Sequence, residues 1–190
     1  HEEWSGIQNP KIKTHAVHKL ELGEHTGTHV DAINHMEIQH KGKSIDKMPL
    51  SMFYTQGICL DFSHKELKEL IEPQGIESAC EKAVVEVKEG DTVLLYTDHY
   101  RKHFETENWG KGPGISAASA RWFGEKKVAD FGVETMSPGV SGVSNREVHH
   151  ICGELNFTHY ENLINIHLLI GKGRCRLIGL PLKIRGGTGS

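Results

Sequence analysis

The sequence lacks the features that mark several large classes of protein. It has no run of lysines and arginines, and its net charge is −3, which argues against a nucleic-acid partner. No apolar stretch approaches the length of a membrane span. The acidic start, His1-Glu2-Glu3-Trp4-Ser5, has no signal-peptide core. We therefore expect a cytoplasmic protein that binds neither nucleic acid nor membrane.

Cysteine is also scarce, and its spacing excludes two kinds of scaffold. The four cysteines form no Cys-x-x-Cys pair, so neither zinc-finger spacing nor a disulfide framework fits. Two of them lie in apolar runs typical of strands, where a free thiol behaves as a small hydrophobic side chain. We expect all four to be reduced core residues, as in a cytoplasmic protein: Cys59, Cys80, Cys152 and Cys175.

Length and patterning favour one α/β domain. The chain has 190 residues, enough for one sizeable core and few for two. Apolar runs at 57–62 and 92–97 predict buried strands. Because strands alternate with helical stretches and tight turns are predicted to join some of the strands, we expect a mixed sheet in a single domain spanning residues 1–190.

Local signals place the helices and loops. Ser63 followed by Glu66 has capping-box spacing and predicts a helix start, with Pro73 ending that helix. Ser116 is expected to cap a further helix. The closing residues 186–190, Gly-Gly-Thr-Gly-Ser, are typical of a flexible tail. The polar, aromatic stretch 98–114 follows a core strand, so it is either a binding loop or an ordinary exposed loop.

One stretch concentrates groups that can bind metal. Residues 25–35 contain His25, His29, Asp31 and His35, all at odd positions, so an extended backbone would put them on one face. A fully extended chain from His25 to Asp31 would span roughly 20 Å, too far for one ion. A metal site therefore requires a bend, and Gly27 is the residue that permits it.

The motif leaves two interpretations open. Imidazole nitrogens with a carboxylate suit zinc or a similar divalent ion. The chain holds 14 histidines, however, and some will be neighbours by chance on a strand and turn with surface imidazoles.

The pattern His-x-Gly-Thr-His-x-Asp with a later histidine resembles the signature of the metal-dependent cyclase-like hydrolases. That family includes bacterial kynurenine formamidases and isatin hydrolases. The resemblance continues through several matches in the same order: Pro49-Leu50, Gly112-Pro113-Gly114-Ile115-Ser116, Glu161-Asn162-Leu163-Ile164-Asn165 and Gly179-Leu180-Pro181-Leu182-Lys183. It implies a swivelling β/β/α fold, assembled as a homodimer or homotetramer. Compared with the family, the sequence is expected to be shortened at both ends.

The resemblance also implies roles for residues. His25, His29 and Asp31 would bind metal, and His35 would be the catalytic general acid/base. In two-metal members a further histidine and glutamate complete a second position. Glu161 matches the glutamate, and the spacing favours His149 over its neighbour His150.

The implied activity is hydrolysis of a C–N bond other than a peptide bond, with one or two zinc or manganese ions per subunit. The substrate is expected to be a small, aromatic amide. A kynurenine formamidase (arylformamidase) of tryptophan catabolism is the first interpretation. The alternatives are an isatin-hydrolase-like cyclic amidase and an inactive metal-binding relative. Trp109, Phe53 and Tyr54 are candidate walls for an aromatic substrate, although each also suits core or loop packing.

Overall fold

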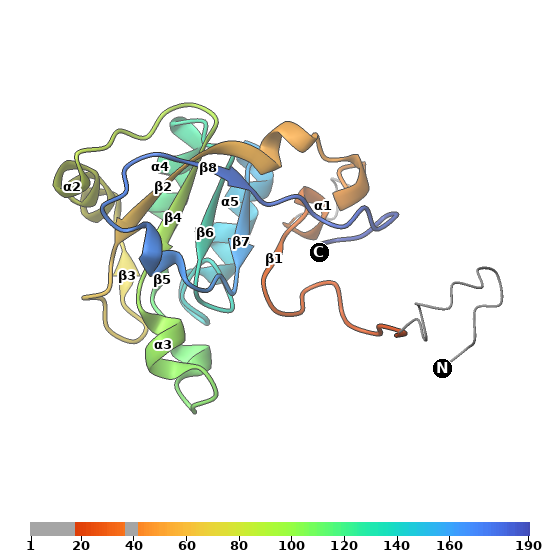
Figure 1. Ribbon diagram of the computed structural model, residues 1–190, viewed down its shortest axis with the longest axis horizontal. Helices are drawn as coiled ribbons and strands as arrows, with labels where there is room; N and C mark the ends of the chain where they lie inside the picture. Colours follow the sequence, from red (N-terminus) through yellow and green to blue (C-terminus); the bar gives the residue numbers. More distant parts are fainter. Residues whose placement is uncertain (1–17, 37–41) are drawn as a thin grey trace, which may run out of the picture.

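A six-stranded mixed sheet organises the molecule (Figure 1). The computed structural model describes residues 18–36 and 42–190. Across the sheet the strands are β1 (His29–Val30), β7 (Thr158–Glu161), β6 (Asp130–Val133), β4 (Asp91–Tyr96), β2 (Tyr54–Asp61) and β8 (Cys175–Ile178). The four inner strands are mutually parallel, whereas β1 and β8 pair antiparallel at the two edges. The predicted single mixed α/β domain is confirmed.

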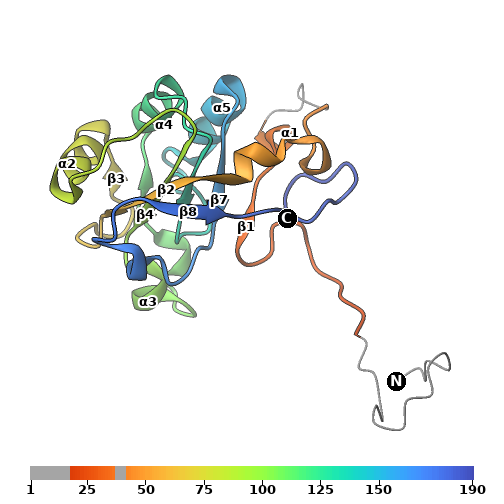
Figure 2. The same cartoon turned by 45° about the horizontal axis from the view of Figure 1, so that its top comes forward.

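Three longer helices cover one face of this sheet (Figure 2). They are α2 (Pro73–Ala83), α4 (Ala117–Glu125) and α5 (Asn145–Leu155). Shorter elements complete the chain: α1 (Ile33–Met36), α3 (His99–His103), the 3-10 turns η2 (Ile45–Lys47), η3 (Leu50–Phe53), η4 (Trp109–Lys111) and η5 (Ile166–Leu169), and the parallel pair β3 (Leu70–Ile71) and β5 (Gly114–Ile115).

The main core lies between the helices and the sheet. Every residue of β4 is buried, as expected for a central strand covered on both faces. Phe123 of α4 stacks on Phe131 of β6 with ring centroids 5.2 Å apart, and both side chains are fully buried. A smaller apolar cluster on the other face joins Cys59, Leu94 and Ile166. The sheet is thus fixed by apolar burial on both sides.

The clearest sequence signals give the observed elements. The run at 92–97 corresponds to β4, and the run at 57–62 falls largely within β2. Ser116 caps α4 as predicted, since its side-chain oxygen accepts a hydrogen bond from the backbone N–H of Ser119 at 3.2 Å. All four cysteines are free thiols, and three of them are buried.

The helix predicted to begin at Ser63 does not form. The backbone there makes turns, in which the backbone N–H of Ser63 donates to the carboxylate of Asp61 and the N–H of Glu66 donates to that of Glu69. These carboxylates satisfy the donors locally, in competition with helix formation. Pro73, expected to end a helix, instead begins α2, a position where a missing N–H costs little.

The expectation of a flexible tail at residues 186–190 is also wrong. The backbones of Val30 and Ser190 exchange hydrogen bonds at 2.9 and 3.1 Å, and the N–H of Ala32 donates to the carbonyl of Thr188 at 2.8 Å. Both views place the end of the chain beside β1 (Figures 1 and 2). The segment therefore continues the sheet edge next to the metal-binding motif.

Within the described ranges, no helix is both long and apolar enough to cross a membrane.

Candidate metal centre

The motif at residues 25–35 bends as the metal hypothesis requires. Gly27 has a φ of +68°, in the left-handed region that favours glycine. Thr28 follows, and its hydroxyl donates to the carbonyl of Asn162 at 2.6 Å, which ties the turn to the chain after β7. His29 lies on the short β1 strand and Asp31 directly after it, so the alternation of the strand directs both side chains to the same side.

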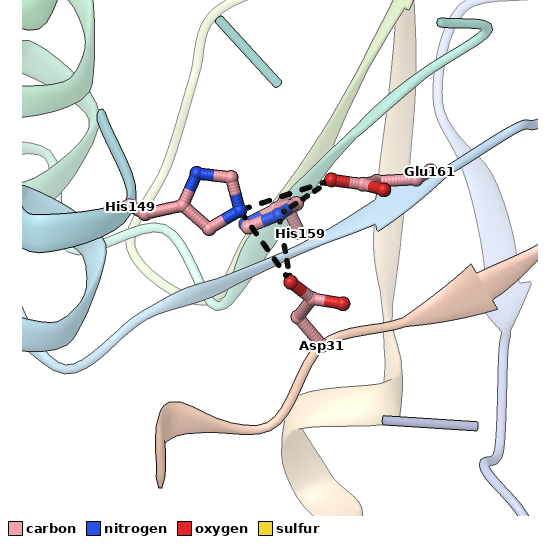
Figure 3. Close-up of side chains that lie close together, drawn as sticks. All are labelled: Asp31, His149, His159 and Glu161. Atoms are coloured by element: carbon pink, nitrogen blue, oxygen red, sulfur yellow. Dashed lines mark hydrogen bonds and ion pairs between the residues drawn. The ribbon is translucent and has the colours of Figure 1, made fainter. Parts of the chain in front are cut away.

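The other half of the cluster comes from β7 and α5. His29 pairs with Glu161 across the antiparallel β1–β7 ladder. His159 and Glu161 are two residues apart on β7 and share a face. His149 reaches the same space from α5, and Figure 3 shows the side chains of His149, His159 and Glu161 close to that of Asp31. Segments more than a hundred residues apart thus meet at one point.

Asp31 is the centre of the cluster, and its side chain is 1% exposed. Its Oδ1 lies 2.8 Å from His25 Nδ1 and 3.3 Å from His29 Nε2. Its Oδ2 faces three other imidazoles, with distances to Nε2 of 3.3 Å for His159, 3.6 Å for His35 and 3.6 Å for His149. The two carboxylate oxygens of Asp31 therefore face different groups of histidines.

The environment of Asp31 favours its charged form. Burial by itself raises the pKa of the carboxyl. The imidazoles of His149 and His159, followed by that of His25, more than offset this and hold the pKa of Asp31 well below its usual range. A charged carboxylate is consequently available as a ligand at neutral pH.

Backbone carbonyls set the direction of two imidazole lone pairs. His29 donates from Nδ1 to the carbonyl of Gly27 at 2.8 Å, and His149 donates from Nδ1 to the carbonyl of Asn145 at 2.8 Å. A carbonyl only accepts, so each Nδ1 carries a proton and each ring turns its Nε2 towards the cluster, where the neutral form offers a lone pair. Burial lowers the pKa of His29, but Asp31 and Glu161 more than offset this and raise it. Metal-binding histidines are held in this way.

These lone pairs face groups that are themselves acceptors. His29 Nε2 is 3.5 Å from Glu161 Oε2, and His149 Nε2 is 3.9 Å from Glu161 Oε1. His29 Nε2 and both oxygens of Asp31 are buried without a hydrogen bond of acceptable geometry. Acceptors that face one another need a proton or a metal cation between them. The donor set of imidazoles and carboxylates fits a divalent metal ion.

Two overlapping groups of side chains have ligand atoms within 4.8 Å of one another. One contains His25, His29 and Asp31, and the other contains Asp31, His149, His159 and Glu161. Asp31 belongs to both groups. Imidazole and carboxylate ligands suit zinc, manganese and similar divalent ions.

His35 lies at the more open side of the cluster. Its side chain is 38% exposed, and its ring centroid is 4.2 Å from that of His25. Burial of the ring lowers the pKa of His35 further than the neighbouring charge of Asp31 raises it, so the imidazole is neutral at pH 7. A neutral imidazole beside a metal position is able to take up or deliver a proton.

The structure brings together all six residues singled out in the sequence, namely His25, His29, Asp31, His35, His149 and Glu161. His149 faces the cluster, whereas the neighbouring His150 is exposed. Sequence reasoning missed His159, which is fully buried and lies 3.2 Å from Glu161 Oε1. The signal was available, because alternation along Thr158–Glu161 places His159 on the face of Glu161.

The three aromatic residues proposed as substrate walls lie elsewhere. Phe53 is fully buried in the core, and Tyr54 stacks with Arg176. Trp109 packs on His99 in the segment after β4. A cavity of about 380 Å³ does adjoin the cluster, and its lining is mainly apolar: Thr28, His29, Val30, Leu94, Tyr160, Leu163, Ile166, Leu177, Ile178, Gly179, Leu180 and Ser190.

Comparison with known proteins assigns the chain to a family. The Cyclase family model, described as "Putative cyclase", matches residues 2–140, and the chain belongs to that family. The chain is 26% identical to a kynurenine formamidase of Bacillus thuringiensis (strain Al Hakam) over 191 residues, which is 98% of this chain and 81% of that protein. It is 27% identical to a kynurenine formamidase of Bacillus cereus (strain ATCC 14579) over 190 residues, with the same coverage.

Solved structures show the same fold. Isatin hydrolase A from Ralstonia solanacearum is 25% identical with a TM-score of 0.78, over 88% of this chain and 70% of that chain. Isatin hydrolase A from Labrenzia aggregata, bound to benzyl benzoate, gives a TM-score of 0.81 at 24% identity, over 92% and 73% of the two chains. The predicted cyclase-like fold is thus confirmed.

Proposed function

We propose that the chain is a metal-dependent hydrolase of amide C–N bonds other than peptide bonds, similar in activity to kynurenine formamidase. The observation that carries this proposal is the arrangement of His29 and His149. Backbone carbonyls hold both rings with their Nε2 lone pairs directed at the carboxylates of Asp31 and Glu161. The names of the relatives support the same class of reaction.

The proposed ligands fall into two positions that share Asp31. His25, His29 and Asp31 would hold one zinc or manganese ion, and Asp31, His149 and Glu161 would hold a second. His159 contacts both carboxylates of the second position, so it is either a further ligand or a donor that orients them. The two oxygens of Asp31 face different groups, which supports one or two ions per subunit.

A bound divalent ion lowers the pKa of water from 15.7 to about 7, which supplies hydroxide at neutral pH. Side chains of the protein would then accept and deliver the protons that the hydrolysis moves. His35 is neutral and lies beside Asp31, so it is placed to accept a proton and to deliver it to the nitrogen of the departing amine. We assign the general acid/base role to His35 on this basis.

The cavity beside His29 favours a substrate with an apolar or aromatic part. Its leucine and isoleucine lining would bury a ring by the hydrophobic effect, while the amide lies towards the cluster. An open-chain aryl formamide such as N-formylkynurenine is the first candidate, which would place the enzyme in tryptophan catabolism. The alternative is a cyclic aryl amide such as isatin, suggested by the structural neighbours.

Hydrolysis of N-formylkynurenine and of isatin, measured side by side with zinc- and manganese-loaded protein, tests the proposal. Turnover of the formyl compound alone supports the formamidase, and turnover of isatin alone supports the cyclic amidase. The Asp31→Asn variant should be inactive in either case. Stoichiometric metal with no turnover of either compound, and with His35 closing the coordination sphere, would indicate an inactive metal-binding relative instead.

We also propose a homodimer or homotetramer located in the cytoplasm. Large apolar side chains on and after β8 are exposed, namely Ile178, Leu180 and Leu182. Several exposed large apolar side chains close together in the chain are typical of an interface. The four free thiols suit a reducing compartment. Light scattering of the purified protein would measure the subunit number, and a monomeric mass would contradict the assembly.

A further inference from the structure

A hydrogen-bonded chain links the metal-binding motif to the segment 186–190. His25 Nε2 and Thr188 Oγ1 are 3.0 Å apart. The same hydroxyl lies 2.6 Å from Glu24 Oε2, and the backbone N–H of Thr188 donates to that oxygen at 2.8 Å. Neither Glu24 nor Thr188 faces the carboxylates of the cluster. Their side chains are linked to Asp31 through the ring of His25.

The chemistry of the three groups fixes the direction of these bonds. A carboxylate only accepts, so the hydroxyl of Thr188 donates its single proton to Glu24. The hydroxyl can then only accept from His25, which requires the proton of the neutral ring to be on Nε2. The Nδ1 lone pair of His25 therefore points at Asp31 Oδ1, 2.8 Å away. Two acceptors this close share either a proton or a metal cation.

We propose that Glu24 and Thr188 are positioning residues that hold His25 as an Nδ1 metal ligand, an inference that rests on the proposed metal-dependent function. His25 needs such support more than His29 and His149 do. His29 and His149 are oriented by backbone carbonyls, whereas the side chain of His25 is 30% exposed and precedes the turn at Gly27. For His25, the Glu24 carboxylate and the Thr188 hydroxyl together do what a backbone carbonyl does for each of the other two rings.

The backbone around Thr188 keeps the hydroxyl in place. Its carbonyl accepts from the N–H of Ala32, and the neighbouring Gly187 carbonyl accepts from the N–H of Ile45 at 3.0 Å. A Cβ on Gly189 would lie 2.7 Å from Cε1 of the His25 ring. The segment thus approaches the imidazole as closely as its backbone allows, and a residue larger than glycine would displace the ring.

Metal affinity tests this proposal without relying on activity. Thr188→Val keeps the shape of the side chain and removes the hydroxyl, and Glu24→Gln removes the charge. Each variant should bind zinc or manganese about 10- to 100-fold more weakly, the range found when partners of metal ligands are lost. Thr188→Ser, which retains the hydroxyl, should restore affinity close to that of the parent protein.

Matched controls separate positioning from general effects. Glu21→Gln makes the same charge change three residues away, where the carboxylate contacts exposed Lys19. Thr106→Val makes the same change at a local contact in the segment after β4. Both should leave metal affinity unchanged. Unaltered affinity in Thr188→Val and Glu24→Gln would overturn the positioning role, whereas absence of metal binding by the parent protein would overturn the proposed function itself.

A second readout follows the tautomer directly. In zinc-loaded protein with ¹⁵N-labelled histidine, the ring of His25 should carry its proton on Nε2, identified as the signal that disappears in His25→Ala. Folded Thr188→Val should lose the slow solvent exchange of that proton. A proton on Nδ1 of His25 in the zinc-loaded parent protein would contradict the proposal.

Discussion

Histidines gather at two places in this molecule, around Asp31 and in the segment that holds α3 and η4. Around Asp31, backbone carbonyls bind one nitrogen of His29 and His149, and the other nitrogen faces a carboxylate. In the α3–η4 segment, His99 donates from Nε2 to the carbonyl of Trp109 and stacks on the indole with centroids 5.2 Å apart. Its other close ring is that of His103, 5.0 Å away.

The difference shows what distinguishes a metal site from a packed group of polar rings. The charged groups that act on His99 are His103 and Lys102, which disfavour a further positive charge. Burial, the larger effect, lowers the pKa of His99 as well. Five histidines face Asp31, and two, His99 and His103, lie in the α3–η4 segment. What differs is whether carboxylates meet the imidazole lone pairs.

Replacing the shared carboxylate should have the largest effect. Asp31→Asn removes the charge that faces all five imidazoles of the cluster, so metal affinity should fall by more than the roughly 100-fold typical of indirect partners. Amide hydrolysis should fall to background because water is no longer activated. Titration with zinc or manganese and a hydrolysis assay measure both. His99→Gln is the control in the α3–η4 segment, and equal losses in the two variants would contradict the comparison.

The next largest predicted effect is a difference between two variants, one that loses only turnover and one that also loses metal binding. His35→Ala should keep metal and lose about 10²- to 10⁴-fold in rate, because it removes the proposed proton shuttle. His29→Ala should lose both metal and activity, since its Nε2 lies 3.3 Å from Asp31 Oδ1. Metal content and single-turnover rates of the two variants provide the test. Hydrolysis by His35→Ala at the parent rate would show that the acid/base assignment is wrong.

A smaller effect distinguishes two close-packed glycines. A Cβ on Gly112 would lie 2.2 Å from Thr135 Cγ2 and 3.0 Å from His99 Nε2. Gly112→Ala should therefore lower the free energy of unfolding by about 1–3 kcal/mol, the usual cost of overpacking, without changing metal affinity. Gly189→Ala, beside His25, should weaken metal binding. Urea unfolding and metal titration of both variants test this contrast, which is refuted if Gly112→Ala weakens binding as much.

The smallest predicted effect is a change in pH dependence. Because the pKa of His99 is lower folded than unfolded, the unfolded chain binds more protons below the ordinary histidine pKa. The stability from neutral His99 is fully present above about pH 6.5 and declines as the pH falls towards the folded-state pKa. His99→Gln should therefore lose less stability than the parent protein between about pH 7.5 and about pH 5.5 in urea titrations. Identical slopes would contradict the assignment.

Much of this site could be predicted from local spacing and family resemblance. The odd-numbered motif, the bend at Gly27 and the spacing of His149 from Glu161 all lie in the sequence. Several elements were predictable as well, because β4 is a continuous apolar run and Ser116 is a strong helix cap. These features depend on short-range chemistry.

What could not be predicted depends on contacts that the local sequence pattern does not specify. Residues 186–190 look like a flexible tail, and only the ladder with Val30 makes them part of the site. Trp109 looks like a substrate wall, and only the fold directs its ring onto His99. The helix expected at Ser63 fails because Asp61 and Glu69 bind the backbone donors locally. In each case, the contact that determines the conformation lies outside the sequence pattern on which the prediction rests.

Anomalous X-ray diffraction at the metal absorption edge, from crystals grown with zinc or manganese, tests the central claim most directly. The account predicts a peak about 2.0–2.2 Å from a carboxylate oxygen of Asp31 and from Nε2 of His29 or His149, as for a zinc ligand set. A stoichiometric metal whose only peak lies in the α3–η4 segment, against His99 or His103, would contradict it.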